Sequence, residues 1–545
     1  MIGAALLTLL VVGAPGCVRQ PEAVDLLLHG GNVLTQSETA PQASALAVRG
    51  DRIVAVGGEE LLTRYRATRT LDLAGRSVLP GFIDSHTHIS GRPPHHIDLA
   101  GIGSIAELQA RVTARAAELP TGAWITGYGW SEDELAEGRR PLRADLDAAA
   151  PDNPVVLTRA GGHSAVASTR ALALADIDAD TPEPEGGVIE READGTPNGI
   201  IRERQDLVTR LVPDTPPAAL RDSLIAALRD QFRHGITSLV QASDRIDYFP
   251  EWQAAYAEHA GTLPRASVQL AWEGPEAMAA FGRVSGDGDE HLRVGAIKVF
   301  VDGGFTGPAA YTREPYKGQP DYRGKLNLSE AELRRVIDEA HGAGWQLGIH
   351  AIGDAAIELT VAALVDTLQR RPRADHRHYL NHFTVMPGAE TLSAMAEHGI
   401  AITQQPNFTF TLEGRYVDNL DGHRLETNNP LRTPLRYGIH LALSSDILPI
   451  GPLLGLEAAV SRRGMSGRVF GADERLTMAE ALAGYTIRGA WLTREEHLKG
   501  SLEPGKLADF VLLAKDPLTT APDAVADIDV LATYLGGREV YRAEP

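Results

Sequence analysis

The chain places two histidines directly behind a short apolar run, in Val78-Leu79-Pro80-Gly81-Phe82-Ile83-Asp84-Ser85-His86-Thr87-His88. The run is typical of a buried strand, and side chains two residues apart on a strand point to the same side. His86 and His88 can therefore reach one cation where the strand ends, because imidazole nitrogen is a common metal ligand. The alternative is a pair of polar residues that caps the strand without binding anything. Residues further along the chain have to decide between these interpretations.

Downstream of this run, apolar strand-like segments alternate with amphipathic helical patterns of about 10 to 15 residues, which is typical of βα units and a parallel sheet. Capping boxes at Ser329-x-x-Glu332 and Thr477-x-x-Glu480 mark two helix starts. We expect an α/β fold in which residues 79–499 form a (β/α)₈ barrel of the TIM type. A Pro- and Gly-rich region at about 91–205, where the alternation is weaker, is interpreted as an insertion after the first barrel strand. The segments expected as barrel strands are 237–241, 296–302, 346–350, 399–403 and 440–446.

Both ends of the chain are rich in short β segments joined by Gly or Gly-Asp turns. Neither end has enough strands to be stable alone. We therefore expect residues 22–78 and 500–545 to pair into one small β-sandwich.

Composition restricts the classes of partner. The chain has 545 residues, 43% of them hydrophobic, and a formal net charge of -20. That charge argues against nucleic acid and anionic lipid surfaces, which would repel it, and leaves small molecules as partners. A homodimer is compatible with the sequence. The single cysteine excludes a disulfide within the chain and thiolate metal sites.

That cysteine, Cys17, follows the apolar run Ala4 to Val12 and the small residues Gly13-Ala14-Pro15-Gly16. The pattern resembles a bacterial lipoprotein signal, in which the cysteine carries the lipid. We expect residues 1–21 to be signal and tether, the protein to sit in the bacterial cell envelope, and the lipid on Cys17 to be its only link to a membrane. Two departures are the lack of Lys or Arg before the run and the position of Pro15. An ordinary cleaved signal or a misassigned start are the alternatives.

Four further residues that can bind a metal lie in or directly after expected strands: Lys298, His350, His382 and Asp446. In a (β/α)₈ barrel the C-terminal strand ends meet at one rim, so distant residues can share a site. Each signal is weak alone, since a strand-end His is often structural and a strand-end Asp often caps a helix. In the order HxH, Lys, His, His, Asp, they indicate one shared site.

With these residues in view, the chain resembles the amidohydrolase superfamily, and within it the amidohydrolase-3 branch that includes the N-substituted formamide deformylases. The resemblance spans nearly the whole length. One departure is Asn381, where relatives often carry Glu before the second lone histidine; we expect it to alter the surroundings of His382. The motifs that carry the resemblance are 79–88, Ile297-Lys298-Val299-Phe300-Val301-Asp302-Gly303-Gly304, His350-Ala351-Ile352-Gly353-Asp354, Gln405-Pro406-Asn407, Ser444-Ser445-Asp446 and 500–509.

The resemblance implies a role for each site residue. His86 and His88 would bind one divalent metal, and His350 and His382 a second, with Asp446 on one of them. Lys298 would bridge the metals as its N-carboxylated form, which needs carbon dioxide, because an ammonium has no lone pair to offer a cation. The alternatives for Lys298 are a side chain that reaches the barrel mouth or a Schiff-base amine. Two zinc ions are expected, with iron or manganese as alternatives.

The same resemblance implies hydrolysis of a carbon–nitrogen bond other than a peptide bond, in a small N-acyl or N-formyl amine. Metal-activated hydroxide would attack the carbonyl, with Asp446 as general base and then acid. His163 resembles a residue near the substrate pocket of relatives and could steady the carbonyl oxygen, or it could be a buried structural histidine. Tyr128-Gly129-Trp130 and the strand-end segments 302–307 and 404–408 are candidate pocket walls.

Two other kinds of function stay open. A deaminase, an ester or phosphoester hydrolase or an isomerase could use the same barrel, because fold alone does not settle chemistry. Outside the enzymes, the chain could be a surface lipoprotein that only binds a metal or ligand.

Overall fold

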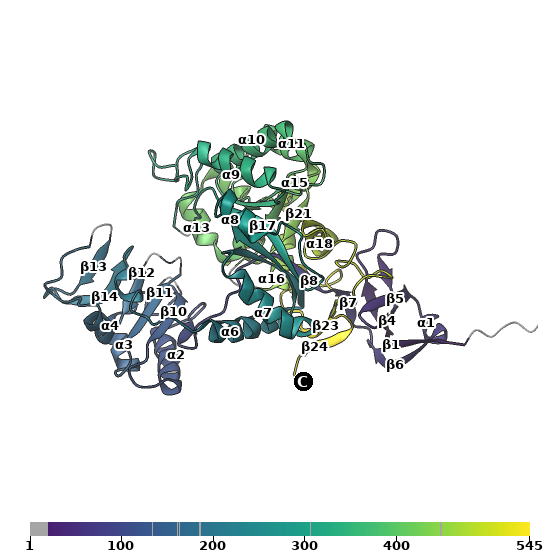
Figure 1. The fold of residues 1–545 in the computed structure, drawn as a ribbon, viewed down its shortest axis with the longest axis horizontal. Coiled ribbons are helices and arrows are strands. Elements are labelled where there is room, and N and C mark those ends of the chain that lie inside the picture. Colours follow the sequence, from purple (N-terminus) through teal and green to yellow (C-terminus); the bar gives the residue numbers. More distant parts are fainter. Residues whose placement is uncertain are drawn as a thin grey trace, which may run out of the picture.

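The computed structural model describes residues 20–132, 134–160, 162, 164–184, 187–305, 307–446 and 450–544. Cys17 with its expected lipid, and His163, lie outside these residues. Figure 1 shows a central barrel between an inserted unit and a sandwich that contains strands from both chain ends. Among the described helices, none combines the length and hydrophobicity needed to cross a membrane.

The barrel is an eight-stranded sheet whose neighbouring strands are parallel, as the sequence predicted. An isolated parallel bridge between Thr87 and Asp446 joins the first strand to the segment after the last, where Asp446 N–H donates to His86 O at 2.9 Å. A strand at 265–271, which the sequence did not suggest, completes the set. The strands are β8 (Phe82–Thr87), β15 (Ile236–Asp244), β16 (Arg265–Ala271), β17 (Leu292–Phe300), β18 (Leu347–Ala351), β19 (Tyr379–His382), β20 (Ala401–Gln404) and β21 (Leu441–Leu443).

Helices around the barrel bury its outer face. The two capping boxes of the sequence precede α9 and α17: the Ser329 hydroxyl accepts from Glu332 N–H, and Thr477 and Glu480 cap each other. The main helices are α6 (Pro217–Asp230), α7 (Phe249–His259), α8 (Pro275–Phe281), α9 (Glu330–Gly342), α10 (Asp354–Arg370), α11 (Ala389–His398), α16 (Pro452–Ser461), α17 (Met478–Gly484) and α18 (Ile487–Leu492). Shorter ones are α12 (Phe408–Thr411), α13 (Glu413–Asn419), α14 (Gly422–Glu426) and α15 (Arg432–Arg436).

The apolar run that precedes the two histidines is two strands rather than one. β7 (Ser77–Pro80) belongs to the sandwich, whereas β8 begins the barrel, and Gly81 lies between them. A Cβ at Gly81 would lie 2.2 Å from Thr237 Oγ1, so only glycine allows this close approach. The chain therefore passes from the sandwich sheet to the barrel sheet at Gly81, where the absence of a side chain allows the close approach.

The sandwich combines both chain ends. β22 (Phe510–Leu513) pairs antiparallel with β7, which joins the C-terminal strands to the N-terminal ones. Leu28 and Val48 of one sheet share a core with Phe510 and Tyr534 of the other. One sheet contains β5 (Arg52–Gly57), β4 (Ala45–Arg49), β1 (Glu22–His29) and β6 (Tyr65–Asp72); the other contains β24 (Arg538–Arg542), β23 (Val530–Leu535), β22, β7, β2 (Asn32–Leu34) and β3 (Gln42–Ala43).

The inserted unit is built on a six-stranded sheet with its own hydrophobic core. Trp130 lies fully buried in that core and donates its indole N–H to Leu157 O at 3.0 Å. The candidate pocket wall at Tyr128-Gly129-Trp130 is therefore part of this sheet, and its tryptophan is structural. The strands are β9 (His96–Asp98), β10 (Ile125–Trp130), β11 (Val155–Arg159), β12 (Ser164–Ala167), β13 (Val188–Arg191) and β14 (Pro197–Arg202), with helices α2 (Ile105–Glu118), α3 (Arg143–Ala149) and α4 (Thr169–Leu174).

The Gly-Lys-Leu-Ala-Asp segment ties the sandwich to the barrel. Asp509 lies directly before β22 and accepts from Arg265 Nε, at the start of β16, at 2.7 Å; both side chains are buried. Its other oxygen accepts from Gly536 N–H at 2.7 Å. The motif therefore acts at the N-terminal end of the barrel strands, away from the strand ends that carry the site residues.

Replacing Asp509 by Asn is expected to lower the free energy of unfolding by about 3–5 kcal/mol, because the Arg265 charge would stay buried without its partner. Urea denaturation followed by circular dichroism measures the loss. The matched control is Asp247→Asn, since Asp247 pairs with Arg245 at 2.8 Å on the open surface. That change is expected to cost no more than about 1 kcal/mol. Equal denaturation midpoints for the two variants would contradict the assignment.

Two histidines, His341 and His378, form a hydrogen-bonded network near the N-terminal end of the barrel strands. His378 Nδ1 accepts from Leu347 N–H at 3.0 Å, so its Nε2–H donates to His341 Nδ1 at 2.8 Å. His341 Nε2–H then donates to Arg371 O at 2.8 Å. Every ring nitrogen of His341 and His378 has a partner that suits the neutral ring, and burial holds the pKa of both histidines below the ordinary value.

This network predicts a loss of stability in acid. The unfolded chain binds these protons near pH 6.5, whereas the folded chain does so only at lower pH. The stabilisation is therefore complete above about pH 6.5 and decreases as the pH falls below it. Urea titrations between pH 7.5 and 5.5 measure the slope, which is expected to be shallower for His378→Asn than for the wild type. Parallel slopes would contradict the prediction.

Candidate metal centre

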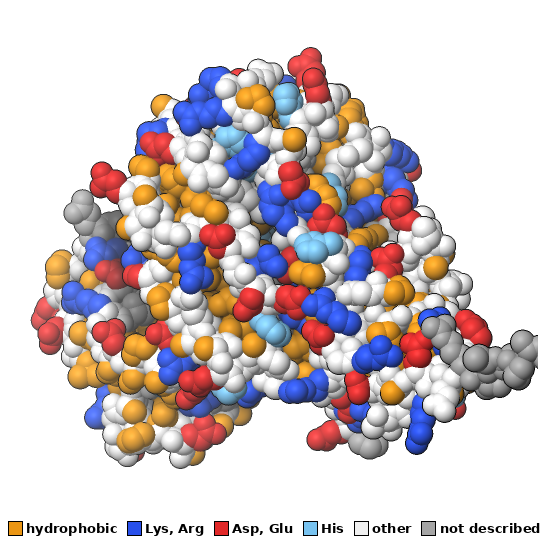
Figure 2. All heavy atoms as spheres, turned by 45° about the vertical axis from the view of Figure 1, so that its right-hand side comes forward, with side chains coloured by type: hydrophobic (Ala, Val, Ile, Leu, Met, Phe, Trp, Pro, Cys, Tyr) orange, Lys and Arg blue, Asp and Glu red, His pale blue; other side chains and the backbone are white. Residues whose placement is uncertain are grey.

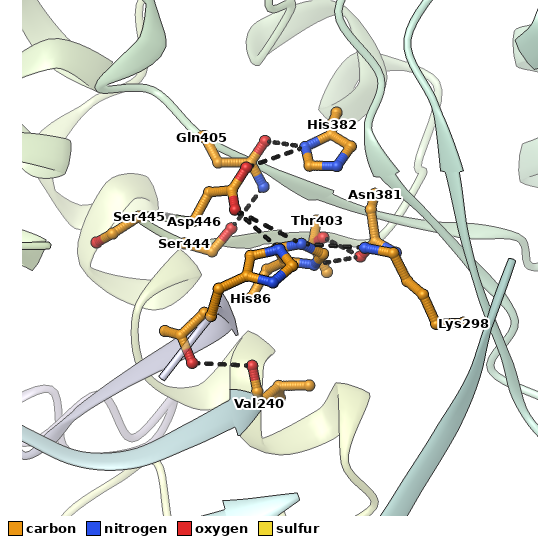
Figure 3. Close-up of polar contacts among 12 residues, drawn as sticks. His86, Val240, Lys298, Asn381, His382, Thr403, Gln405, Ser444, Ser445 and Asp446 are labelled. Atoms are coloured by element: carbon orange, nitrogen blue, oxygen red, sulfur yellow. Dashed lines mark hydrogen bonds and ion pairs between the residues drawn. The ribbon is translucent and has the colours of Figure 1, made fainter. Parts of the chain in front are cut away.

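The structure brings together six of the seven residues that the sequence singled out. His86 is the fifth residue of β8 and His88 follows that strand, while Lys298 lies near the end of β17. The other three are His350 in β18, His382 at the end of β19 and Asp446 just after β21. All six lie toward the C-terminal ends of barrel strands. Figure 3 shows His382 and Gln405 beside Asp446, and Asn381 and Lys298 beside His86. His163 lies outside the described residues.

Distances among these side chains are those of one cluster. His88 Nε2 lies 3.2 Å from Asp446 Oδ1, and Lys298 Nζ lies 3.2 Å from His86 Nε2. His86, His88 and Asp446 each offer one atom that can bind a metal. These three atoms lie within 4.8 Å of one another, close enough to hold a single ion. His382 Nδ1 is 3.7 Å from Asp446 Oδ2.

Asn381 fixes the tautomer of His86. The Asn381 amide oxygen lies 2.9 Å from His86 Nδ1 and accepts from the Thr403 hydroxyl at 2.9 Å. His86 Nδ1 therefore carries the proton, and its Nε2 lone pair faces Lys298 and Asp446. The sequence predicted that Asn381 would alter the surroundings of its neighbour His382. That prediction is wrong, because Asn381 binds the ring of His86 instead.

The partner of His382 is Gln405, which follows β20. His382 Nδ1 lies 2.8 Å from the Gln405 amide oxygen, and Gln405 Nε2 donates to the Ser444 hydroxyl at 2.9 Å. These contacts leave His382 Nε2 as the free acceptor. Gln405 was assigned to a pocket wall, but its role in the structure is to orient a site histidine (Figure 3).

Burial keeps most of the cluster uncharged. It lowers the pKa of Lys298 to about 7 and the pKa of His382 to about 4, because the charged forms lose their hydration. His86 and His350 are likewise held well below the ordinary histidine pKa by burial. Asp446 differs: burial would raise its pKa, but the His88 hydrogen bond and nearby imidazoles outweigh it, and the carboxyl stays ionised. The site thus joins one carboxylate to neutral nitrogen donors.

His350 Nε2 shows that the cluster fits a metal. The atom is buried and has no hydrogen-bond partner among the described residues, with Asp302 Oδ1 3.6 Å away, and its ring lies 4.5 Å from the ring of His382, centroid to centroid. A buried polar atom without a partner is costly and calls for an unseen ligand. Neutral imidazoles and a carboxylate are a donor set that suits divalent cations such as zinc.

Two buried aspartates that the sequence did not single out position the cluster. Asp84 accepts from Ser445 N–H at 3.0 Å, which fixes the segment that carries Asp446 to the strand that carries His86. Asp302, directly after β17, accepts from Ile352 N–H and Gly353 N–H at 3.0 and 2.9 Å and so fixes the loop behind His350. Burial raises the pKa of each of these aspartates to about 7, while backbone N–H groups favour the charged form.

The backbone is strained where two side chains of the cluster, His382 and Asp446, leave their strands. His382 has φ of 76° and Asp446 has φ of 63°, both in the left-handed region that side chains other than glycine seldom adopt. Such conformations cost about 1–3 kcal/mol each and persist where the surroundings hold them. The hydrogen bond from Asp446 N–H to His86 O is one of those constraints.

Aromatic rings stand beside the cluster. Phe300 ends β17 and is 41% exposed, and its ring centroid lies 5.5 Å from that of His350. Phe408 stacks at 6.4 Å on the ring of His382. Phe408 belongs to the segment 404–408, which the sequence proposed as a pocket wall, whereas Phe300 precedes the proposed segment 302–307; Thr306 lies outside the described residues.

Comparison with known proteins identifies the family. The amidohydrolase family model matches residues 69–541. The N-substituted formamide deformylase of Arthrobacter pascens is 30% identical, across 94% of this chain and 97% of its own. YtcJ of Bacillus subtilis (strain 168) is also 30% identical, across 94% and 98% of the two chains.

Solved structures agree with the fold. An uncharacterised metal-dependent hydrolase from Pyrococcus horikoshii superposes with a TM-score of 0.72 at 24% identity, over 91% of this chain and 99% of that one. A counterpart from Pyrococcus furiosus gives 0.69 at 26% identity, over 91% and 100%. With the family model and these relatives covering most of its length, the chain belongs to the metal-dependent amidohydrolase superfamily, in the amidohydrolase-3 branch.

Proposed function

We propose that the protein hydrolyses the carbon–nitrogen bond of a small N-acyl or N-formyl amine. The observation that carries this proposal is the convergence of four imidazoles, Lys298 and one ionised carboxylate at a single strand-end rim. The formamide deformylase among its relatives supports the amide-type bond. The phenylalanines beside the cluster favour a substrate with an apolar substituent.

Six side chains would hold the metal. His86, His88 and Asp446 form one set of donors, and His350 and His382 a second, with Lys298 next to His86. A divalent cation bound there supplies Lewis acidity, which lowers the pKa of a water molecule and polarises a carbonyl group. The tautomers set by Asn381 and Gln405 keep Nε2 of His86 and His382 free for this purpose.

Asp446 would move the proton. Its carboxylate is ionised in the folded protein and lies at the centre of the cluster, so an oxygen atom can accept a proton from the attacking water. The same carboxyl group then donates that proton to the departing nitrogen, so the amine leaves neutral.

Lys298 would serve as a carbamate. Burial leaves a large share of its amine uncharged near neutral pH, and a neutral amine has the lone pair that adds to carbon dioxide. The addition forms an N–C bond at the expense of one carbon–oxygen π bond of carbon dioxide and releases one proton, which turns the neutral amine into an anionic oxygen ligand. That charge suits the space beside His86 better than an ammonium would once a cation is bound.

A product-resolved substrate panel tests the proposed reaction. N-formyl and N-acetyl benzylamine are expected to release benzylamine and the free acid, at rates that fall when a chelator removes the metal. An aminated heterocycle and phenyl acetate, incubated under the same conditions, separate a deaminase or an esterase by the product formed. Turnover of these two without turnover of the amides, or no turnover of any compound by metal-loaded protein, would overturn the proposal.

A further inference from the structure

A groove lies between the sandwich and helices α17 and α18, at the opposite end of β21 from the metal cluster. His440, directly before β21, lines it, whereas Asp446 follows that strand at the other end. The groove has a volume of about 700 Å³, within the range of small-molecule sites. The residues that line it include none of the six in the cluster.

Arg488 of α18 lines this groove; its backbone oxygen accepts from His440 Nε2–H at 2.9 Å, but its guanidinium has no hydrogen bond or ion pair among the described residues. Its Nη1 atom is fully buried without a hydrogen bond, and no described carboxylate lies within ion-pair distance. Burial lowers the pKa of Arg488, and the charge of Glu480 opposes that effect only in part. An unpaired guanidinium in such a place is costly and calls for an anion.

Three nearby carboxylates, those of Glu480, Glu496 and Glu503, are engaged elsewhere, and no ion pair joins Arg488 to Glu38, which also lines the groove. Glu496 pairs with Arg377 at 2.9 Å, and Glu503 with Lys506 at 2.9 Å. Glu480 pairs with Arg432 and caps α17. Acidic and basic side chains are interspersed over the whole molecular face that Figure 2 draws, so ion pairs such as these are available to the surface carboxylates.

Part of the wall of the groove is apolar. Ile487 and Ala483 line one side and Leu34 of the sandwich the other. Trp491, one turn along α18 from Arg488, lies 3.9 Å from the His440 ring, centroid to centroid. A flat or extended hydrocarbon fits such a wall by burying its own apolar surface.

We propose that the groove binds a small amphipathic carboxylate, whose carboxylate pairs with Arg488 and whose hydrocarbon part lies along Ile487 and Trp491. A guanidinium and a carboxylate match in geometry and charge. A doubly charged phosphate is disfavoured, because Glu38, Glu496 and Glu503 also line the groove and would repel the second charge.

The test uses 3-phenylpropionate as the probe and its amide, 3-phenylpropanamide, as the neutral analogue. Isothermal titration calorimetry of the metal-loaded protein is expected to show one saturable site, with the amide binding at least about tenfold more weakly. Arg488→Gln is expected to weaken binding of the carboxylate by about tenfold or more. Arg436→Gln, which removes an exposed arginine at the end of α15, is the matched control and is expected to bind like the wild type.

Two further measurements distinguish this groove from the metal cluster. Binding is expected to persist in metal-stripped protein, since no cluster residue lines the groove. Ala479→Trp, which fills the groove from α17 and keeps its charge, is expected to weaken binding even if Arg488→Gln does not fold. Equal affinity of wild type, Arg488→Gln and Ala479→Trp, loss of binding on metal removal, or no saturable binding up to about 10 mM would each overturn the proposal.

Discussion

Replacing Asp446 by Asn is expected to lower kcat/KM by about 10²- to 10⁴-fold, the usual contribution of a positioned general base and acid. The amide keeps the shape of the side chain but cannot accept a proton from water or hand one to the leaving nitrogen. Asp446 is buried and hydrogen-bonded to His88 at 3.2 Å. Among the six residues of the cluster it is the one carboxylate, so no other member can take over the proton transfer. Steady-state rates on N-formyl benzylamine measure the loss.

Metal content separates proton transfer from metal binding in this variant. Five donors remain when Asp446 becomes Asn, so elemental analysis is expected to give a metal content close to that of the wild type. Asp244→Asn is the matched control, because Asp244 is a partly buried carboxyl at the end of β15 that pairs with Trp252 Nε1 at 2.6 Å. It is expected to retain most of the activity. Turnover by Asp446→Asn at the wild-type rate would refute the assigned role.

Replacing Lys298 by Met is expected to reduce metal affinity by at least about 100-fold and to abolish most turnover. Methionine fills a similar volume in the barrel but has no amine to carboxylate. Wild-type protein stripped of metal is expected to regain activity faster when bicarbonate is supplied with the metal, because the carbamate forms only with carbon dioxide. The carbamate carbon is expected to appear in the ¹³C spectrum after growth on labelled bicarbonate.

The control for this prediction is Lys499, which is also buried but pairs with Glu495 at 2.9 Å, away from the cluster. Lys499→Met is expected to lose stability, but its reconstitution is expected to keep the bicarbonate dependence of the wild type. If Lys298→Met bound two metals with unchanged affinity, Lys298 would not be a ligand.

The barrel and the cluster could be predicted because both follow from local pattern and one geometric rule. Apolar strands that alternate with helices specify a parallel barrel, and its strand ends converge wherever the chain places them. Lys298, His350 and Asp446 could therefore be grouped although no sequence spacing links them. The strand at 265–271 and the inserted sheet were missed, because their short segments lack a clean alternation and their pairing depends on contacts far along the chain.

The partners of the site histidines could not be predicted from adjacency. Neighbouring residues on a strand normally face opposite sides, so Asn381 is not free to serve the ring of His382. The positive φ of His382 turns that residue away from the regular strand, which lets Gln405 on the next strand reach it instead. Such contacts depend on strand register and backbone strain, which one sequence does not display.

Anomalous diffraction from a crystal of the active enzyme, recorded at the absorption edge of its metal, tests the existence of the metal centre most directly. The expected result is strong density among His86, His88 and Asp446, with a second peak beside His350 and His382. An active enzyme without such density, or with its metal bound elsewhere in the chain, would contradict the account.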